Sequence, residues 1–460
     1  MVVILKHQRN RIIFAGFFLI VGGLVLLMSQ CIIPGFKCER QRTNLLPKPV
    51  TLDVWNVFED KDIYKDLIQR YQTANPNVTI NYEMLEFDEY RRRLIESFAA
   101  GEGPDIFVIH NTWLPMHKGQ IAPAPPSLDA AVNFDSIYPD AVKFDFTRIA
   151  EDGSNFVYAL PLAIETLGIF YNEDYFEAQN ITSAPKIWDE VVDYARLFTR
   201  LDEQGNIRIS GASLGTINNI NRSTDIVGLL MMQGGARMNN DKLTEAAFDE
   251  PVLVIENGAE KKFYPGRDAL NFYAAFGDKT KAVYSWNDSM SYSIDAFVEG
   301  RSVMMVNYPH HIPTIKAKAP HLNFKTAPVP QLKDRKEDTN YASYWGFTVA
   351  KNSDKVQEAW DFIDFLASPD SVKTYTEKTH LPVARKDLIF WQQQDPELKH
   401  FATQILTARS WYQGDSDEAE KAIRDMVESL HAGIKNADEA VEDAAARITS
   451  RIKQIRDAEN

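Results

Sequence analysis

The sequence contains very little cysteine and has no excess of basic residues. Its 460 residues include two cysteines, Cys31 and Cys38, both near the N-terminus. The body of the chain therefore has no disulfide and no cysteine-ligated metal site, so its stability must come from burial of apolar surface. Acidic residues outnumber basic ones by 64 to 50, which gives a formal net charge of -14. A non-specific nucleic-acid-binding protein is normally basic, so no nucleic-acid partner is expected.

Motifs of common catalytic centres are also missing. No GxSxG, HExxH, P-loop or GxGxxG stands in a fitting context. The pair His310-His311 has no carboxylate or cysteine partner at metal-ligand spacing, and adjacent side chains point in different directions. We therefore expect no enzyme activity, no cofactor and no metal. Glycoside cleavage by two carboxylates stays open as an alternative, because their separation in space cannot be read from a sequence.

The N-terminal segment is long and apolar. A basic head precedes residues 12–33, which include no charged residue. This length is enough to cross a bilayer, whereas the apolar core of a secretory signal spans about 7–15 residues. We expect residues 1–36 to be a retained membrane anchor and 37–49 a tether, with the body in the periplasm or outside the cell. A cleaved signal, or a lipoprotein signal with Cys31 as the lipidated residue, is the competing interpretation.

The body begins with alternating strand and helix patterns. Apolar residues alternate over 50–54 and 78–82, recur at helical spacing over 63–71 and 90–98, and form a short run at 106–109. This order predicts a parallel α/β sheet with right-handed crossovers. Ligands of such sheets bind at the carboxyl ends of the strands. Since the chain is too long for one ordinary core, we expect two or more lobes.

Six stretches, taken together, resemble one protein family. They are WNVFEDKDIYKDLIQRYQTANPNVTINY (55–82), FAAGEGPDIFVIH (98–110), YALPLAIETLGIFYNEDYF (158–176), FVEGRSVMMVN (297–307), YWGFTVAKNSDKVQEAWDFIDFLASPDSVKTY (344–375) and NADEAVEDAAARI (436–448). In this order they resemble the extracellular solute-binding proteins of ABC importers, in the sugar-binding group related to maltose-binding protein. Each stretch is weak alone, but six in order over most of the body are specific.

The resemblance implies a two-lobed, periplasmic-binding-protein-like α/β fold of the class II type, whose lobes close on a solute about a hinge. One implied lobe comprises residues 50–160 and 327–380, and the other comprises 161–326 and 381–460. The implied crossings between them lie near Leu160–Leu162, Lys325–Pro330 and Leu381-Pro382.

The resemblance also implies a function and partners. The chain would be a monomeric receptor that binds a mono- or oligosaccharide between its lobes and delivers it to the membrane subunits of an ABC permease. The alternatives are a membrane-anchored extracellular carbohydrate-active enzyme and a sensor that presents its ligand to a signalling partner. A polyol, a glycerophosphodiester or a peptide is an alternative ligand.

Glu165 is the first candidate for a ligand contact. It interrupts the apolar run from Ala159 to Tyr171, where an unpaired buried carboxylate would be costly. An ion pair with Arg148 or Arg222 is the structural alternative. The resemblance implies instead that this carboxylate lies in the cleft and accepts hydrogen bonds from ligand hydroxyls.

The other candidates follow predicted strands or lie in loops where the resemblance implies ligand contacts. The polar candidates are Asn56, Asn111, Thr112, Asn221, Arg222 and His310, and the aromatic candidates are Trp55, Trp113, Tyr308, Trp345 and Trp411. Tyr and Trp rings can stack on a sugar. Arg222 would donate several fixed hydrogen bonds and would favour an anionic group on the ligand, although neutral sugars also bind arginine. Loop capping and core packing are the structural alternatives at these positions.

Overall fold

The computed structural model describes residues 48–150, 152–256 and 259–459. The expected anchor and both cysteines lie outside these residues. Within the described part of the chain, no helix is long and apolar enough to span a membrane. Val50–Asn460 forms a compact unit of its own.

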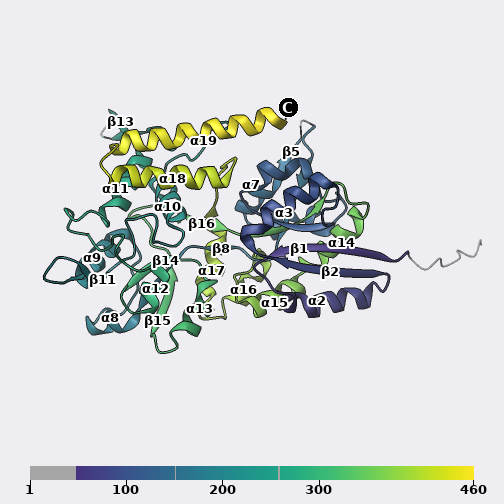
Figure 1. Ribbon diagram of the computed structural model, residues 1–460, viewed down its shortest axis with the longest axis horizontal. Coiled ribbons are helices and arrows are strands. Elements are labelled where there is room, and N and C mark those ends of the chain that lie inside the picture. The colour runs from purple at the N-terminus through teal and green to yellow at the C-terminus, as the bar shows by residue number, and fades with distance from the viewer. Residues whose placement is uncertain (1–47, 151, 257–258, 460) are drawn as a thin grey trace, which may run out of the picture. The chain divides into compact units, whose positions relative to one another are not determined.

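The first sheet of this unit has six strands. Five lie in the order β2 (Val78–Leu85), β1 (Val50–Val57), β3 (Ile106–His110), β17 (Trp345–Ala350) and β4 (Ile121–Ala122), and β7 (Leu160–Pro161) also pairs with β17. Strand β1 is parallel to β2 and β3, whereas β17 is antiparallel to β3. The predicted strand–helix order is confirmed, with α2 (Lys61–Ala74) and α3 (Phe87–Ala100) as the crossover helices. Figure 1 shows α2 and α3 on opposite faces of the β1–β2 pair.

Local sequence explains how the first crossover forms. Asp60 caps helix α2, because its carboxylate accepts a hydrogen bond from the backbone N–H of Asp62 at 3.0 Å. The helix then buries an apolar stripe of residues spaced three and four apart against the sheet. These residues are Tyr64, Leu67, Ile68 and Tyr71. The loop between β1 and α2 is therefore held at the carboxyl end of the sheet.

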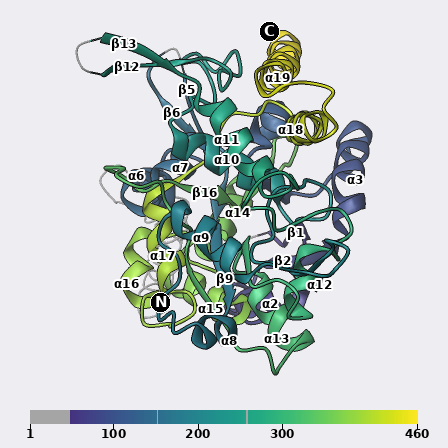
Figure 2. The ribbon, with the colours of Figure 1, turned by 90° about the vertical axis from the view of Figure 1, so that its left-hand side faces the viewer.

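The second half of the fold has a smaller sheet and most of the long helices. The antiparallel strands lie in the order β14 (Met304–Asn307), β9 (Gly168–Asn172) and β15 (Phe324–Pro328). The main helices are α9 (Trp188–Phe198), α10 (Ser223–Gly234), α11 (Pro265–Ala275), α18 (Ser416–His431) and α19 (Ala437–Glu459). Helices α18 and α19 pack side by side in both ribbon views (Figures 1 and 2). The strands β12 (Val252–Glu256) and β13 (Ala259–Phe263) form an exposed hairpin at the edge of this half.

Helices α14 (Val356–Leu366) and α15 (Pro369–Thr379) return to the first sheet. The buried face of α14 includes Trp360, Phe362 and Ile363, which belong to the same apolar core as the strands β1 and β3. This far segment of the chain thus completes the first half.

A small sheet joins the two larger apolar cores. Its strands lie in the order β18 (Ala408–Arg409), β16 (Asn340–Ser343) and β8 (Glu165–Thr166). In each strand or within two residues of it, one residue packs in the first core and a close neighbour packs in the second. These pairs are Ile164 and Leu167, Ala342 and Tyr341, and Ala408 and Trp411. The chain therefore passes between the two cores three times within one sheet. Leu160 and Leu162, where the first crossing was expected, both pack in the first core.

Candidate ligand-binding cavity

A cavity of about 740 Å³ lies beside the joining sheet and is lined by residues of both halves. This volume is within the range of about 300–1,000 Å³ that is usual for small-molecule sites. The first half contributes the loop after β1 and the end of β3. The second half contributes the start of α10, the turn after β14 and the start of α18. The cavity thus lies at the carboxyl end of the first sheet, where the strand order predicted a ligand.

Glu165 pairs with His310, another predicted site residue. Its Oε1 atom accepts a hydrogen bond from the backbone N–H of His310 at 3.1 Å and lies 2.8 Å from the ring Nδ1. Burial lowers the pKa of His310, but the nearby Glu165 charge and hydrogen bond outweigh this effect, so that the pKa is raised. The Glu165 side chain is 18% exposed. The carboxylate is therefore paired, although it interrupts an apolar run.

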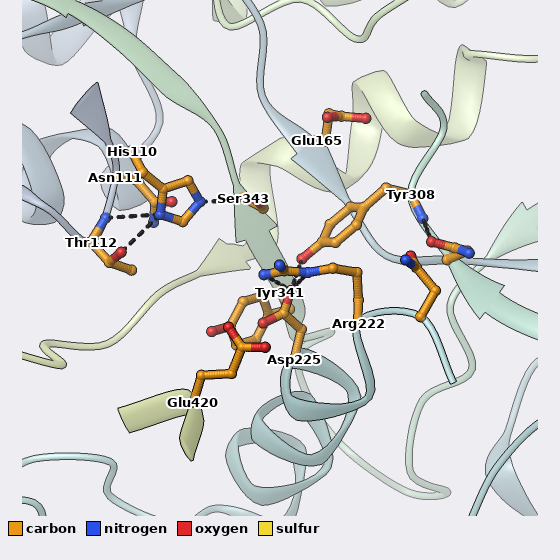
Figure 3. A network of polar contacts seen from close by, with 12 residues as sticks. His110, Asn111, Thr112, Glu165, Arg222, Asp225, Tyr308, Tyr341, Ser343 and Glu420 are labelled. Atoms are coloured by element: carbon orange, nitrogen blue, oxygen red, sulfur yellow. Dashed lines mark hydrogen bonds and ion pairs between the residues drawn. The ribbon is translucent and has the colours of Figure 1, made fainter. Parts of the chain in front are cut away.

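Arg222 forms an ion pair with a buried carboxylate. Its Nε atom donates to Oδ2 of Asp225 at 2.7 Å, and the hydroxyl of Tyr308 donates to the same oxygen at 2.8 Å (Figure 3). Asp225 is the main cause of a raised pKa of Arg222. Burial and then Asp225 raise the pKa of Tyr308 well above its ordinary value. Because its charge is already compensated, Arg222 does not by itself favour an anionic ligand.

His110, at the end of β3, connects the first sheet to the joining sheet. Its Nδ1 atom lies 2.8 Å from Oγ1 of Thr112, and its Nε2 atom lies 3.2 Å from Oγ of Ser343 (Figure 3). Burial, helped by the charge of Arg222, lowers the pKa of His110 to about 3. The ring is therefore neutral at physiological pH and can exchange hydrogen bonds with both hydroxyls.

An aromatic wall covers the first-half side of the cavity. The ring of Trp345 packs edge-on against Trp113 and Phe58, with centroids 5.0 and 5.8 Å away. Phe58 stacks on Phe87 at 5.3 Å, and the two residues are 64% and 47% exposed. Phe58 has a φ of 69°, a left-handed conformation that is unusual for a bulky side chain. The fold thus accepts backbone strain at a residue whose ring faces the cavity.

Glu59 follows Phe58 and is held by neutral donors. Its Oε2 atom accepts hydrogen bonds from Asn56 Nδ2 at 3.2 Å and from the hydroxyl of Tyr64, and its Oε1 atom accepts one from the hydroxyl of Tyr375. Burial raises the pKa of Glu59, and these three hydrogen bonds offset part of that effect. The carboxylate is therefore aligned at the cavity without a cation among these three partners.

The cavity brings together nine of the twelve predicted residues. They are Asn56, Thr112, Trp113, Glu165, Arg222, Tyr308, His310, Trp345 and Trp411. Ligand contact by each of them stays a prediction.

The other three candidates, Asn111, Trp55 and Asn221, do not line the cavity, and each has a partner within the protein. The side chain of Asn111 points inward, where its Nδ2 atom donates to Asp145 Oδ2 at 3.0 Å. Trp55 lies on β1 under the guanidinium of Arg93, 4.8 Å from the ring centroid. Asn221 Nδ2 donates to the hydroxyl of Tyr292 at 2.9 Å, so this amide orders a loop.

The cavity is also lined by Phe58, Glu59, His110 and Asp225, which are additional to these twelve residues. Phe58 and Glu59 follow β1, and His110 ends β3. Their positions at the carboxyl ends of strands are a sequence feature that indicates a ligand site. Asp225 stands three residues after Arg222, a spacing that brings side chains together at a helix start. Within the described residues, no group of three or more His, Cys, Asp or Glu side chains could hold a metal ion.

Two α/β halves joined by three strands around a solute-sized cavity define a class of solute-binding protein. The family model for bacterial extracellular solute-binding proteins matches residues 66–400. The chain belongs to this family, which confirms the resemblance seen in the sequence and implies an extracytoplasmic body.

Named relatives include two sugar-binding proteins. A maltotriose-binding protein of Pyrococcus abyssi is 23% identical over 357 residues, which cover 75% of this chain and 68% of that protein. A multiple sugar-binding protein of Streptococcus mutans is 23% identical over 370 residues, covering 80% and 81%.

Solved structures show the same fold. The sugar-binding protein MalE of Xanthomonas citri has a TM-score of 0.71 at 18% identity, and the match covers 89% of this chain and 99% of that one. A solute-binding protein of Thermotoga lettingae, bound with alpha-D-tagatose, has a TM-score of 0.68 at 20% identity, covering 87% and 99%.

Proposed function

We propose that this protein is an extracytoplasmic receptor that binds a carbohydrate in the cavity and delivers it to an ABC permease. The observation that carries the proposal is the pairing of aromatic faces with charged hydrogen-bonding groups around one cavity. Trp345 and Phe58 offer apolar faces to a sugar ring, and Glu165 and Arg222 offer an acceptor and a donor to its hydroxyls. Sugar-binding proteins among the relatives support the same ligand class.

The joining sheet would be the hinge. The chain reaches both cores within two residues of each of β8, β16 and β18, so a small change in these strands would move one half relative to the other. We take the two cores as the two lobes. A ligand that contacts both lobes stabilises the closed arrangement, because it binds that arrangement better than the open one. No chemical step is part of this function.

Glu165 would act at the centre of this hinge. It belongs to β8 and faces the cavity, and it is paired with His310 of the second half. Ligand hydroxyls would share the carboxylate with His310, so that sugar binding and lobe closure are coupled at one residue.

The N-terminal segment would hold the receptor at the membrane near its permease. Its uncharged residues 12–33 support a retained anchor, and a monomeric body suits delivery of one ligand at a time. Extraction of membranes with carbonate tests this part. A retained anchor stays with the lipid, and a Cys31→Ser variant that is released instead would show that lipidation is the attachment.

The ligand proposal is tested by thermal unfolding of the full-length protein in detergent against a panel of saccharides. A sugar that binds only the folded state adds about 2.7 kcal/mol to the free energy of unfolding at 100 times its Kd. The melting temperature rises accordingly. We expect at least one sugar to do so at millimolar concentration, and Glu165→Gln to remove most of the shift. Absence of a shift with every saccharide would overturn the proposal.

A further inference from the structure

The cavity wall carries more carboxylates than permanent cations. Six carboxylates line it: Glu59, Asp60, Glu165, Asp225, Asp417 and Glu420. The permanent cations of the lining are Arg222 and Lys378. Arg222 pairs with Asp225, and Lys378 Nζ lies 2.7 Å from Oδ2 of Asp66. The charge of both cations is thus compensated within the protein, so the wall presents a net negative charge to a ligand.

Glu59 has no cation among the hydrogen-bond partners that the described part of the chain gives it. Three other lining carboxylates have arginine partners: Asp225 with Arg222, Asp417 with Arg91, and Glu420 with Arg424. The hydrogen-bond partners of Glu59 are instead the neutral side chains of Asn56, Tyr64 and Tyr375. They hold the two oxygens in place, yet they leave the negative charge to be balanced from the cavity.

Glu59 shares this corner of the cavity with a second carboxylate and two aromatic rings. The carboxylate of Glu165, a second wall residue, further disfavours ionisation of Glu59, so two carboxylates act on the same space. The adjacent Phe58 packs with Trp345, and both rings line the cavity. Aromatic faces attract cations through their electron-rich faces. A cation in this corner would meet carboxylates and aromatic faces together.

We propose that the cavity selects a saccharide that carries a protonated amino group, and that Glu59 is the carboxylate that receives this group. The inference rests on the proposed function and names the class of sugar. The ammonium replaces the missing cation beside Glu59, while Glu165 and Arg222 remain available to hydroxyls. A sugar with a carboxylate or phosphate group would face the net negative wall and is rejected.

The test compares matched sugars on the full-length protein by calorimetric titration. The probes are glucosamine, glucose and glucuronate, and galactosamine, galactose and galacturonate, at about pH 6.5, where primary amines and carboxylates are both ionised. In at least one series we expect the amino sugar to bind about tenfold tighter than the neutral one, and the uronate to bind weakest. Salt at about 0.5 M should reduce the preference, because it screens charge.

A variant assigns the preference to Glu59. Glu59→Gln should reduce the preference for the amino sugar about tenfold, with little loss for the neutral sugar. Glu96→Gln, an exposed carboxylate that pairs with Arg92 on α3, is the matched control and should change neither affinity. If Glu59→Gln does not fold, the comparison of sugars on the unaltered protein still tests whether the cavity prefers an amino sugar.

The outcomes separate this inference from the proposed function. Equal or tighter binding of neutral sugars, including neutral oligosaccharides alone, overturns the inference and leaves the sugar receptor standing. A preference that persists in Glu59→Gln overturns the role of Glu59. A chain that binds no saccharide overturns the proposed function and this inference with it.

Discussion

The carboxylate of Glu165 contacts His310 twice, through the backbone N–H at 3.1 Å and through the ring Nδ1 at 2.8 Å. The two residues are 145 positions apart in the chain and come from the joining sheet and the second half. A carboxylate that interrupts an apolar run thereby has a partner at the cavity, and this partner can itself gain or lose a proton.

Replacing Glu165 by Gln should lower the pKa of His310. The pairing with Glu165 raises this pKa against the effect of burial, and Gln removes the charge while it keeps the shape. A titration of the histidine ring signals by NMR measures the change. The ring of His110, whose pKa is held at about 3 by burial and by Arg222, serves as the internal control and should not titrate between about pH 5 and 8. An unchanged His310 pKa would contradict the pairing.

The same pair should make stability depend on pH. Because the pKa of His310 is higher in the folded state, its pairing stabilises the fold below the ordinary histidine pKa of about 6.5 and loses this effect as pH rises through the folded-state value. The melting temperature of the unaltered protein should therefore exceed that of Glu165→Gln by more at about pH 5.5 than at about pH 8.5. An equal difference at both pH values would show that the pair contributes nothing through charge.

Replacing Asp225 by Asn should destabilise the protein. The change leaves the guanidinium of Arg222 without its charge partner, at a cost of about 1–3 kcal/mol once partial exposure of Arg222 is taken into account. Tyr308→Phe removes one hydrogen bond to the same oxygen and should cost about 1 kcal/mol. Urea unfolding measures both. If Tyr308→Phe proved the more damaging change, the ion pair would not be the main stabilising contact.

Replacing Phe58 by Asn should weaken sugar binding without loss of stability. Asn tolerates a positive φ, so the change relieves about 1 kcal/mol of backbone strain and offsets the lost ring contacts. The affinity should fall because an aromatic face of the cavity is gone. Phe87→Asn is the matched control, since Phe87 begins helix α3 with ordinary helical geometry and offers no strain to relieve. Titration calorimetry measures the sugar affinity of both variants. Urea unfolding shows whether Phe58→Asn, but not Phe87→Asn, keeps the stability of the unaltered protein.

Asp145 should make the fold less stable as pH rises from about 4 to 6. Burial raises the pKa of Asp145 to about 6, and the hydrogen bonds from Ser410, Tyr344 and Asn111 offset only part of this effect. The folded state therefore binds a proton that the unfolded state has released, which costs about 2–3 kcal/mol once both states are ionised. The free energy of unfolding, measured against pH, should fall less steeply in Asp145→Asn than in the unaltered protein.

Local sequence was sufficient for the elements and for part of the site. The alternation at β1 and β2 and the apolar stripe of α2 follow directly from side-chain periodicity. The ends of β1 and β3 were candidate positions because polar loops follow buried strands there. Periodicity does not give the direction of a loop side chain, however. Asn111 therefore turned out to point at Asp145 while its neighbour Thr112 faces the cavity.

The sequence by itself determined that a carboxylate at Glu165 must have a partner, because an unpaired charge within an apolar run is too costly. Only the tertiary structure decided which partner that is. Contacts such as Glu165 with His310, or Glu59 with Tyr375 across 316 residues, depend on how β8, β16 and β18 bring distant segments together. Pairing between strands is non-local, so the same periodic pattern is compatible with many partners until the whole chain has folded.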